Sequence, residues 1–175
     1  MTADARPLRL FFALWPDDAA RAALERWSAA IHRASGGRAT RGDSIHMTLA
    51  FLGDCDPERL DELKAAAAVV RVRPFDLVLD EAGFWKHNRI AWAGATQTPA
   101  PLETLASDLR AALAAARFAF DPKPFVSHVT LVRKAQPGFV MPALAPIRWQ
   151  VTDFVLVRSV MRPAGSDYPI EARWG

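Results

Sequence analysis

The chain has 175 residues, of which 51% are hydrophobic and 23% are charged. This composition is typical of a globular protein and excludes a disordered or low-complexity chain. The net charge of +3 is too small to require a polyanionic partner, although it permits one. The length fits one domain, or one domain built of two lobes.

The sequence contains no candidate membrane segment. No stretch approaches the roughly 20 apolar residues that cross a bilayer. The apolar run Leu10–Trp15 is short, lacks a signal-peptide cleavage site and leads directly into a predicted helix. Cys55 is the single cysteine, so an internal disulfide is excluded and a reducing compartment fits. We therefore expect a soluble, cytoplasmic protein that does not bind membranes.

The first part of the chain predicts two strands, each followed by a helix. Leu8–Leu14 is an apolar run between two prolines, which favours a buried strand. Asp17 and Asp18 favour the start of a helix, and apolar residues then recur every three or four positions. Alternation over Ile45–Phe51 predicts the second strand, and the second helix begins near Pro57.

The rest of the chain predicts more strands and one further helix. Phe75–Trp85 and Arg89–Ala95 form a predicted hairpin, and the third helix begins near Pro99. The last three strands are predicted at Phe125–Lys134, Trp149–Val160 and Tyr168–Trp174. The order β-α-β-α-β-β-α-β-β-β lacks strict βαβ alternation, so we expect the α+β class, with residues 1–175 forming a single domain.

The tetrapeptide H-x-T-L occurs twice, at His46–Leu49 and at His128–Leu131. The chain has four histidines, eight threonines and seventeen leucines. Composition alone gives a histidine this context with a probability of about 0.0044, and gives two of four histidines this context with a probability on the order of one in ten thousand. The pair is therefore a strong signal, and a degenerate internal repeat is a reasonable hypothesis.

The two motifs predict a cleft lined by imidazoles and hydroxyls. Residues two apart on a strand share a face, so His46 lies beside Thr48, and His128 lies beside Thr130. The apolar positions expected on the opposite, core-facing side are Met47, Leu49, Phe51, Val129 and Leu131. A one-residue slip would bury the histidines, so this register is well specified.

Two histidines and two threonines suit displacement at phosphorus. One neutral imidazole can act as a general base while its protonated partner acts as a general acid, each contributing about 10²–10⁴ in rate. The hydroxyls can donate hydrogen bonds to the nonbridging oxygens of a phosphate. This chemistry needs neither a metal nor another cofactor.

Three alternatives explain the motifs less well. A lone histidine is usually a structural residue, but the repetition argues against that interpretation. A metal site needs three or four ligands and would leave the threonines unexplained. Ser44 and Ser127 lie near the motif histidines, but the chain has no G-x-S-x-G sequence for nucleophilic catalysis.

The paired motifs resemble the H-x-[ST] motifs of the 2H phosphoesterase superfamily, and within it the bacterial RNA 2′,3′-cyclic phosphodiesterases, also called 2′-5′ RNA ligases. The resemblance includes RLFFALWPDDAARAAL, HMTLAFLGD, DEAGFWKHNRIAWAG and KPFVSHVTLVRKA, and it spans nearly the whole chain. It implies a bilobal, pseudo-twofold α+β fold. In that fold two mostly antiparallel sheets face a central cleft and the helices lie outside.

The resemblance also implies an activity. His46 would be the general acid that protonates the departing 3′-oxygen, and His128 the general base that activates water. Thr48, Thr130 and Arg133 would bind the phosphate. The substrate would be RNA with a 2′,3′-cyclic phosphate end, tRNA-like fragments included, and ATP-independent 2′-5′ ligation would accompany hydrolysis. The protein is expected to act as a monomer.

Some assignments stay open at this point. Arg133 is five residues after His128, so ideal alternation turns it away from the cleft unless the strand ends, twists or bulges. Trp85, Trp92 and Phe11 are candidates for stacking on a base, and core packing is the alternative. The rival functions are a 2H phosphodiesterase for a small cyclic or 2′-5′-linked nucleotide and a non-catalytic nucleotide-binding module.

Overall fold

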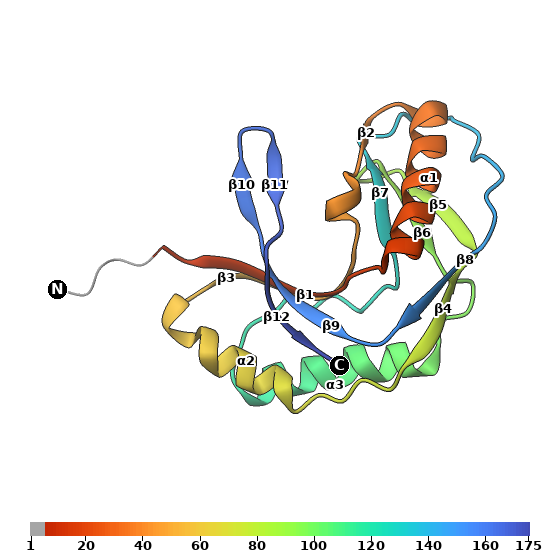
Figure 1. The fold of residues 1–175 in the computed structure, drawn as a ribbon. Helices are drawn as coiled ribbons and strands as arrows, with labels where there is room; N and C mark the ends of the chain where they lie inside the picture. The colour runs from red at the N-terminus through yellow and green to blue at the C-terminus, as the bar shows by residue number, and fades with distance from the viewer. Residues whose placement is uncertain (1–5) are drawn as a thin grey trace.

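The computed structural model describes residues 6–175 (Figure 1). Within this range the α-helices are α1 (Asp18–Ser35), α2 (Leu60–Ala68) and α3 (Ala100–Ala115), with short 3₁₀ turns at Gly42–Ser44 and Pro57–Arg59. The strands are β1 (Leu8–Leu14), β2 (Arg38–Ala39), β3 (Met47–Cys55), β4 (Phe75–Leu79), β5 (Glu81–Trp85), β6 (Ile90–Gly94), β7 (Val129–Arg133), β8 (Ile147–Val151), β9 (Phe154–Arg158), β10 (Val160–Arg162), β11 (Gly165–Asp167) and β12 (Ile170–Trp174).

Two four-stranded antiparallel sheets carry the two motifs. Their strand orders are β12-β9-β1-β3 and β2-β7-β6-β5. β3 and β7 each begin one residue after a motif histidine, and they pair with β1 and β6 respectively. The starts of β1 and β6, of α1 and α3, and of β3 and β7 are each 82 positions apart. The predicted α+β class with facing antiparallel sheets is confirmed, and this constant spacing is what an internal repeat produces.

Each long helix covers the sheet that holds the other half's motif. The side chain of Asp17 accepts a hydrogen bond from the backbone N–H of Ala20 (2.7 Å) and so caps α1. The buried face of α1 includes Leu24, Trp27 and Ile31 and packs against β7 and β8. α3 packs against β3 and α2. Figure 1 shows these helices on the outer sides of the two sheets, and one hydrophobic core joins both halves.

Two predicted strands are divided in the structure. Phe75–Trp85 breaks at Asp80, so that β4 pairs with β8 while β5 pairs with β6. The Asp80 carboxylate accepts hydrogen bonds of 2.8 Å from the N–H and the hydroxyl of Thr96, which holds the chain where it changes sheets. Trp149–Val160 is divided in the same way among β8, β9 and β10.

No helix in the described range is long and apolar enough to span a membrane.

Candidate functional site

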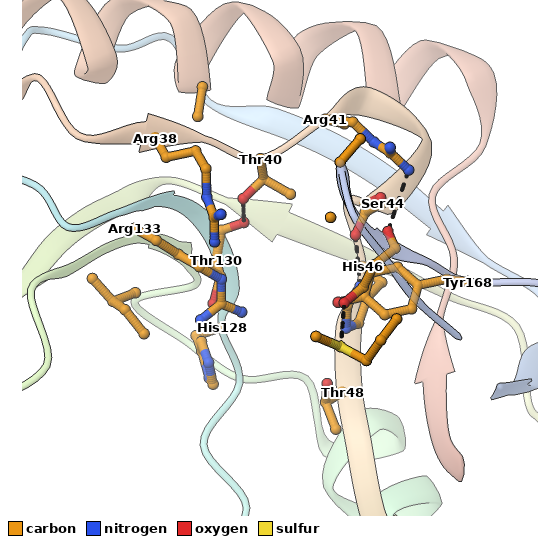
Figure 2. Close-up of a pocket in the computed structure, with 16 residues that line it drawn as sticks. Arg38, Thr40, Arg41, Ser44, His46, Thr48, His128, Thr130, Arg133 and Tyr168 are labelled. Carbon is orange, nitrogen blue, oxygen red and sulfur yellow. Dashed lines mark hydrogen bonds between the residues drawn. The ribbon is translucent and has the colours of Figure 1, made fainter. Parts of the chain in front are cut away.

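A cleft of about 620 Å³ contains both motifs. Figure 2 shows Arg38, His128, Thr130 and Arg133 on one side of it, and Arg41, Ser44, His46, Thr48 and Tyr168 on the other. The structure therefore brings together all five residues that the sequence predicts as catalytic or phosphate-binding. The remaining lining residues are Ala39, Thr40, Ile90, Met161, Ala164, Gly165 and Ser166.

Each motif strand bulges at its leucine. In the β1–β3 ladder, Phe12 pairs with Ala50 but the next residue pairs with Thr48, so Leu49 is an extra residue. In the β6–β7 ladder, Leu131 is skipped in the same way between Thr130 and Val132. Both leucines are fully buried, as is the residue that follows each of them. Two consecutive buried residues on a strand are the consequence of a bulge.

The bulges reverse the alternation that the sequence predicts. Arg133, at an odd offset from His128, lines the cleft because the bulge at Leu131 shifts the register by one residue. The expectation that Phe51 faces the main core is wrong for the same reason. Its ring joins a small separate cluster that includes Phe11 and Tyr168.

Backbone carbonyls orient both motif histidines. The Nδ1 of His46 lies 2.7 Å from the carbonyl oxygen of Ser44, and the Nδ1 of His128 lies 2.8 Å from that of Val126. A carbonyl oxygen only accepts, so Nδ1 carries the proton in each ring. The lone pair of each neutral Nε2 is therefore left available, which is the arrangement a general base requires.

Aromatic rings surround His46. Trp15 stacks on the imidazole at a centroid distance of 5.2 Å and an interplanar angle of 3°, Phe11 lies at 4.9 Å, and Tyr168 meets it edge-on at 5.5 Å. Burial lowers the pKa of His46 to about 4, an effect that the hydrogen bond to Ser44 opposes and the positive charge of Arg133 reinforces. His46 is consequently neutral in the free protein at pH 7.

His128 lies close enough to Arg133 to feel its positive charge. Burial lowers the pKa of His128, and the positive charge of Arg133 lowers it further. Arg38 and Arg133 lie directly opposite each other in the β2–β7 ladder, and neither forms a salt bridge within the described residues. Like charges at such positions destabilise a sheet. Two adjacent guanidinium groups that face a cleft form a site for an anion such as phosphate.

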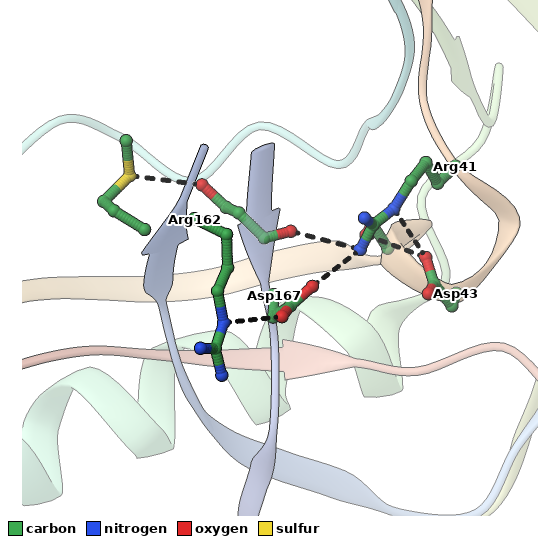
Figure 3. A network of polar contacts seen from close by, with 7 residues as sticks. Arg41, Asp43, Arg162 and Asp167 are labelled. Atoms are coloured by element: carbon green, nitrogen blue, oxygen red, sulfur yellow. Dashed lines mark hydrogen bonds and ion pairs between the residues drawn. The ribbon is translucent and has the colours of Figure 1, made fainter. Parts of the chain in front are cut away.

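A hairpin that the sequence analysis missed completes the cleft. β10 and β11 form a separate two-stranded sheet, and Met161, Gly165 and Ser166 on it line the cleft. Arg41 holds this hairpin with a hydrogen bond of 3.0 Å to Asp167 (Figure 3). β10 begins at the last residue of the predicted strand Trp149–Val160, and β11 lies in the segment before the predicted strand Tyr168–Trp174, so no periodicity indicated a hairpin.

The three candidates for base stacking lie outside the lining of the cleft. Phe11 is 4% exposed, and its ring packs against His46, so it offers no free face to a base. Trp92 lies across Gly83, where an added Cβ would collide with the indole. Trp85 packs between Trp92 and the edge of His128, at 5.3 and 4.8 Å. Trp85 and Trp92 are partly exposed and lie beside the second motif, because Trp92 pairs with Thr130 across the β6–β7 ladder.

No group of three or more His, Cys, Asp or Glu side chains in residues 6–175 is arranged to hold a metal ion.

Comparisons with known proteins agree with this geometry. Residues 14–92 match the family model described as LigT like Phosphoesterase. The RNA 2′,3′-cyclic phosphodiesterase of Escherichia coli (strain K12) is 34% identical over 170 residues, which cover 96% of each chain. The corresponding protein of Thermus thermophilus is 31% identical over 93% of this chain and 87% of its own. The crystal structure of E. coli LigT complexed with 3′-AMP superposes with a TM-score of 0.84 over 96% of this chain and 97% of that one, at 33% identity. The paired motifs, the two-sheet fold and these similarities together show that the chain belongs to the LigT-like phosphoesterases of the 2H superfamily.

Proposed function

We propose that this protein hydrolyses the terminal 2′,3′-cyclic phosphate of RNA to a 2′-phosphate, with His46 and His128 as an acid–base pair. The observation that carries the proposal is that two imidazoles, each fixed through Nδ1 by a backbone carbonyl, line one cleft together with two threonines. The names of the relatives from E. coli and T. thermophilus support the same substrate.

In the proposed reaction, water attacks the phosphorus of the cyclic ester. His128 accepts the proton of the attacking water at Nε2, and the bond between phosphorus and the 3′-oxygen breaks. His46 gives a proton to the 3′-oxygen, which leaves as a hydroxyl, and the phosphate stays on the 2′-oxygen. Thr48, Thr130 and Arg133 stabilise the charge that develops on the nonbridging oxygens.

The general acid must acquire its proton as the substrate binds. Burial keeps His46 neutral in the free protein at pH 7, since its pKa is about 4. A phosphate anion placed beside the ring favours the charged imidazolium and raises its pKa. Substrate binding and protonation of His46 are therefore linked, and the two neutral histidines become one acid and one base in the complex.

Arg38 and Arg133 favour a substrate that carries more than one phosphate, as RNA does. Both line the cleft without an acidic partner in the described residues, so the cleft presents two cations to phosphate oxygens. If the 5′-hydroxyl of a second RNA replaces water as the nucleophile, the same steps form a 2′-5′ linkage. The cyclic ester supplies the phosphoryl group, so ligation needs no ATP.

The product isomer tests the proposal. An oligonucleotide with a 2′,3′-cyclic phosphate end is incubated with the protein in excess chelator, and a cyclic mononucleotide is assayed in parallel. We expect a 2′-phosphate product and higher kcat/KM for the oligonucleotide. A 3′-phosphate product, or no turnover of either substrate, would rule out the proposed reaction. Faster turnover of the mononucleotide would support the rival with a small nucleotide as substrate.

A further inference from the structure

The carbonyl oxygen of each bulge leucine accepts a hydrogen bond from a covering helix. The hydroxyl of Ser28, on α1, donates to the carbonyl of Leu131 at 2.8 Å. The Nε and Nη2 groups of Arg110, on α3, both lie 3.4 Å from the carbonyl of Leu49. A bulge leaves its extra residue outside the ladder with one neighbouring strand, so its carbonyl can accept from another element.

The two donors occupy equivalent positions in the repeat. Ser28 and Arg110 are 82 positions apart, which is also the interval between His46 and His128. A serine and an arginine share no chemistry except that both donate hydrogen bonds. At these matched positions both donate to the same atom of the corresponding motif, the carbonyl oxygen of the bulge leucine.

Further hydrogen bonds tie each motif to the segment that leads into the other. Thr40, six residues before His46, donates its N–H to the carbonyl of Leu131 (2.8 Å) and its hydroxyl to that of Thr130 (3.1 Å). In the other half, the Nη1 group of Arg110 donates to the carbonyl of Lys123 at 2.7 Å. Lys123 lies five residues before His128, so Arg110 touches the first motif and the approach to the second.

We infer that Ser28 and Arg110 are positioning residues, which hold the bulges at Leu131 and Leu49 and thereby keep the motif side chains aimed into the cleft. The bulge at Leu131 is what turns Arg133 toward the cleft, and a loss of the bulge would turn it away. Neither Ser28 nor Arg110 lines the cleft, so both act through the backbone. The inference rests on the proposed function, since activity is one of its readouts.

The test compares each positioning residue with a matched control. Ser28→Ala removes a hydroxyl that is 2% exposed. The control Ser35→Ala removes an equally buried hydroxyl, which donates at 2.8 Å to the carbonyl of Ile31 within the same helix. Arg110→Met removes a guanidinium that donates to backbone carbonyls. The control Arg59→Met also removes a guanidinium, one that donates at 3.0 Å to the carbonyl of Ala116 and lies over a phenylalanine ring.

We expect Ser28→Ala and Arg110→Met each to lower kcat about tenfold, because small displacements of catalytic groups are costly. The controls should change kcat less than twofold while they lower the melting temperature by a similar amount. Arg110→Lys, which keeps a donor, should recover part of the loss. Equal kcat values for the positioning variants and their controls would overturn the inference.

A second readout does not depend on turnover. Inorganic phosphate is titrated into each variant while the NMR signals of the histidine rings are followed. Ser28→Ala should weaken phosphate binding and shift the signals of His128, and Arg110→Met should shift those of His46, whereas the controls shift neither. Unchanged signals in both variants would also overturn the inference.

If the wild type binds phosphate but hydrolyses no cyclic ester, the proposed function fails while this titration still tests the positioning. If Ser28→Ala does not fold, the variants of Arg110, a partly exposed side chain, complete the test.

Discussion

The two motifs share one backbone geometry but lie in different surroundings. Each has a histidine bonded to the carbonyl two residues earlier, a threonine on the cleft and a bulge at the leucine. Five residues after the histidine, however, the first motif has Phe51 and the second has Arg133. The repeat therefore fixes where the side chains point, and individual substitutions decide what each half contributes.

These differences give the two imidazoles different environments. Trp15 and Phe11 exclude water from His46, which lowers its pKa to about 4. On the other side, Arg133 supplies positive charge near His128, and Arg38 lies opposite Arg133 in the β2–β7 ladder. A repeated backbone geometry with different side chains around each histidine can hold a phosphate between the two rings. It can still give the two histidines opposite proton-transfer roles.

The largest expected effect comes from removing either imidazole. His46→Ala and His128→Ala should each lower kcat by about 10²–10⁴, because each removes one proton-transfer group. Circular dichroism should show a folded protein in both cases. Steady-state kinetics with an oligonucleotide that ends in a cyclic phosphate measures the loss.

His32 provides a matched control for these variants. Its Nδ1 also lies near a carbonyl oxygen, that of Gly36 at 3.1 Å, but the ring is at the end of α1 and does not line the cleft. His32→Ala should keep normal turnover. Near-normal turnover in either motif variant would contradict the acid–base mechanism.

The next largest effect tests the position where the halves differ. Arg133→Met should lower kcat/KM about 100-fold, because it removes a charged donor to the phosphate. The same variant should melt at an equal or slightly higher temperature, since it relieves the repulsion from Arg38. Kinetics and thermal unfolding of one preparation measure both quantities.

Phe51→Leu is the counterpart in the first motif. Its ring packs in the small cluster with Phe11 and Tyr168, so the change should cost stability and alter kcat/KM only a few-fold. Equal losses of kcat/KM from Arg133→Met and Phe51→Leu would show that the two matched positions do not differ in function.

The elements and the motif pair could be predicted from sequence because both depend on local patterns. The apolar periodicity predicts each helix start to within a few residues, and the repeated H-x-T-L predicts that His46 and His128 share a cleft. The bulges could not be predicted, because Leu49 and Leu131 look like ordinary core positions of an alternating strand. Their conformation depends on hydrogen bonds from helices far away in the sequence.

The β10–β11 hairpin was missed for a related reason. Its strands have three residues each, and they carry little apolar pattern. The contact that holds the hairpin joins Arg41 to Asp167, which are 126 positions apart. A pairing at this separation leaves no local signal, so the wall that the hairpin adds to the cleft appears only in the structure.

The free energy of unfolding should depend on pH through His46. Its pKa is about 4 in the folded protein and about 6.5 in an unfolded chain, so the unfolded state binds more protons between these values. The stability that the neutral ring contributes is complete above pH 6.5 and is lost as the pH falls to 4, by about 2–3 kcal/mol. Urea unfolding at several pH values measures this loss.

His46→Gln isolates that contribution. The carboxylates that titrate near pH 4 affect both proteins alike, so the difference between wild type and variant belongs to the imidazole. We expect the variant to lose less stability between pH 6.5 and pH 4. Parallel curves would mean that burial does not keep this ring neutral.

The smallest expected effect tests whether the tryptophan beside each histidine acts on that histidine alone. Trp15→Leu removes the ring stacked on His46 and admits water, so the pKa of His46 should rise from about 4 toward 6.5 while that of His128 stays unchanged. Trp85→Leu is the counterpart, because Trp85 meets His128 edge-on at 4.8 Å and should affect only that histidine. NMR titration of both rings in each variant gives four values. If either tryptophan variant changed the pKa values of both histidines equally, the two rings would share one environment. The different proton-transfer roles would then have to come from the bound substrate alone.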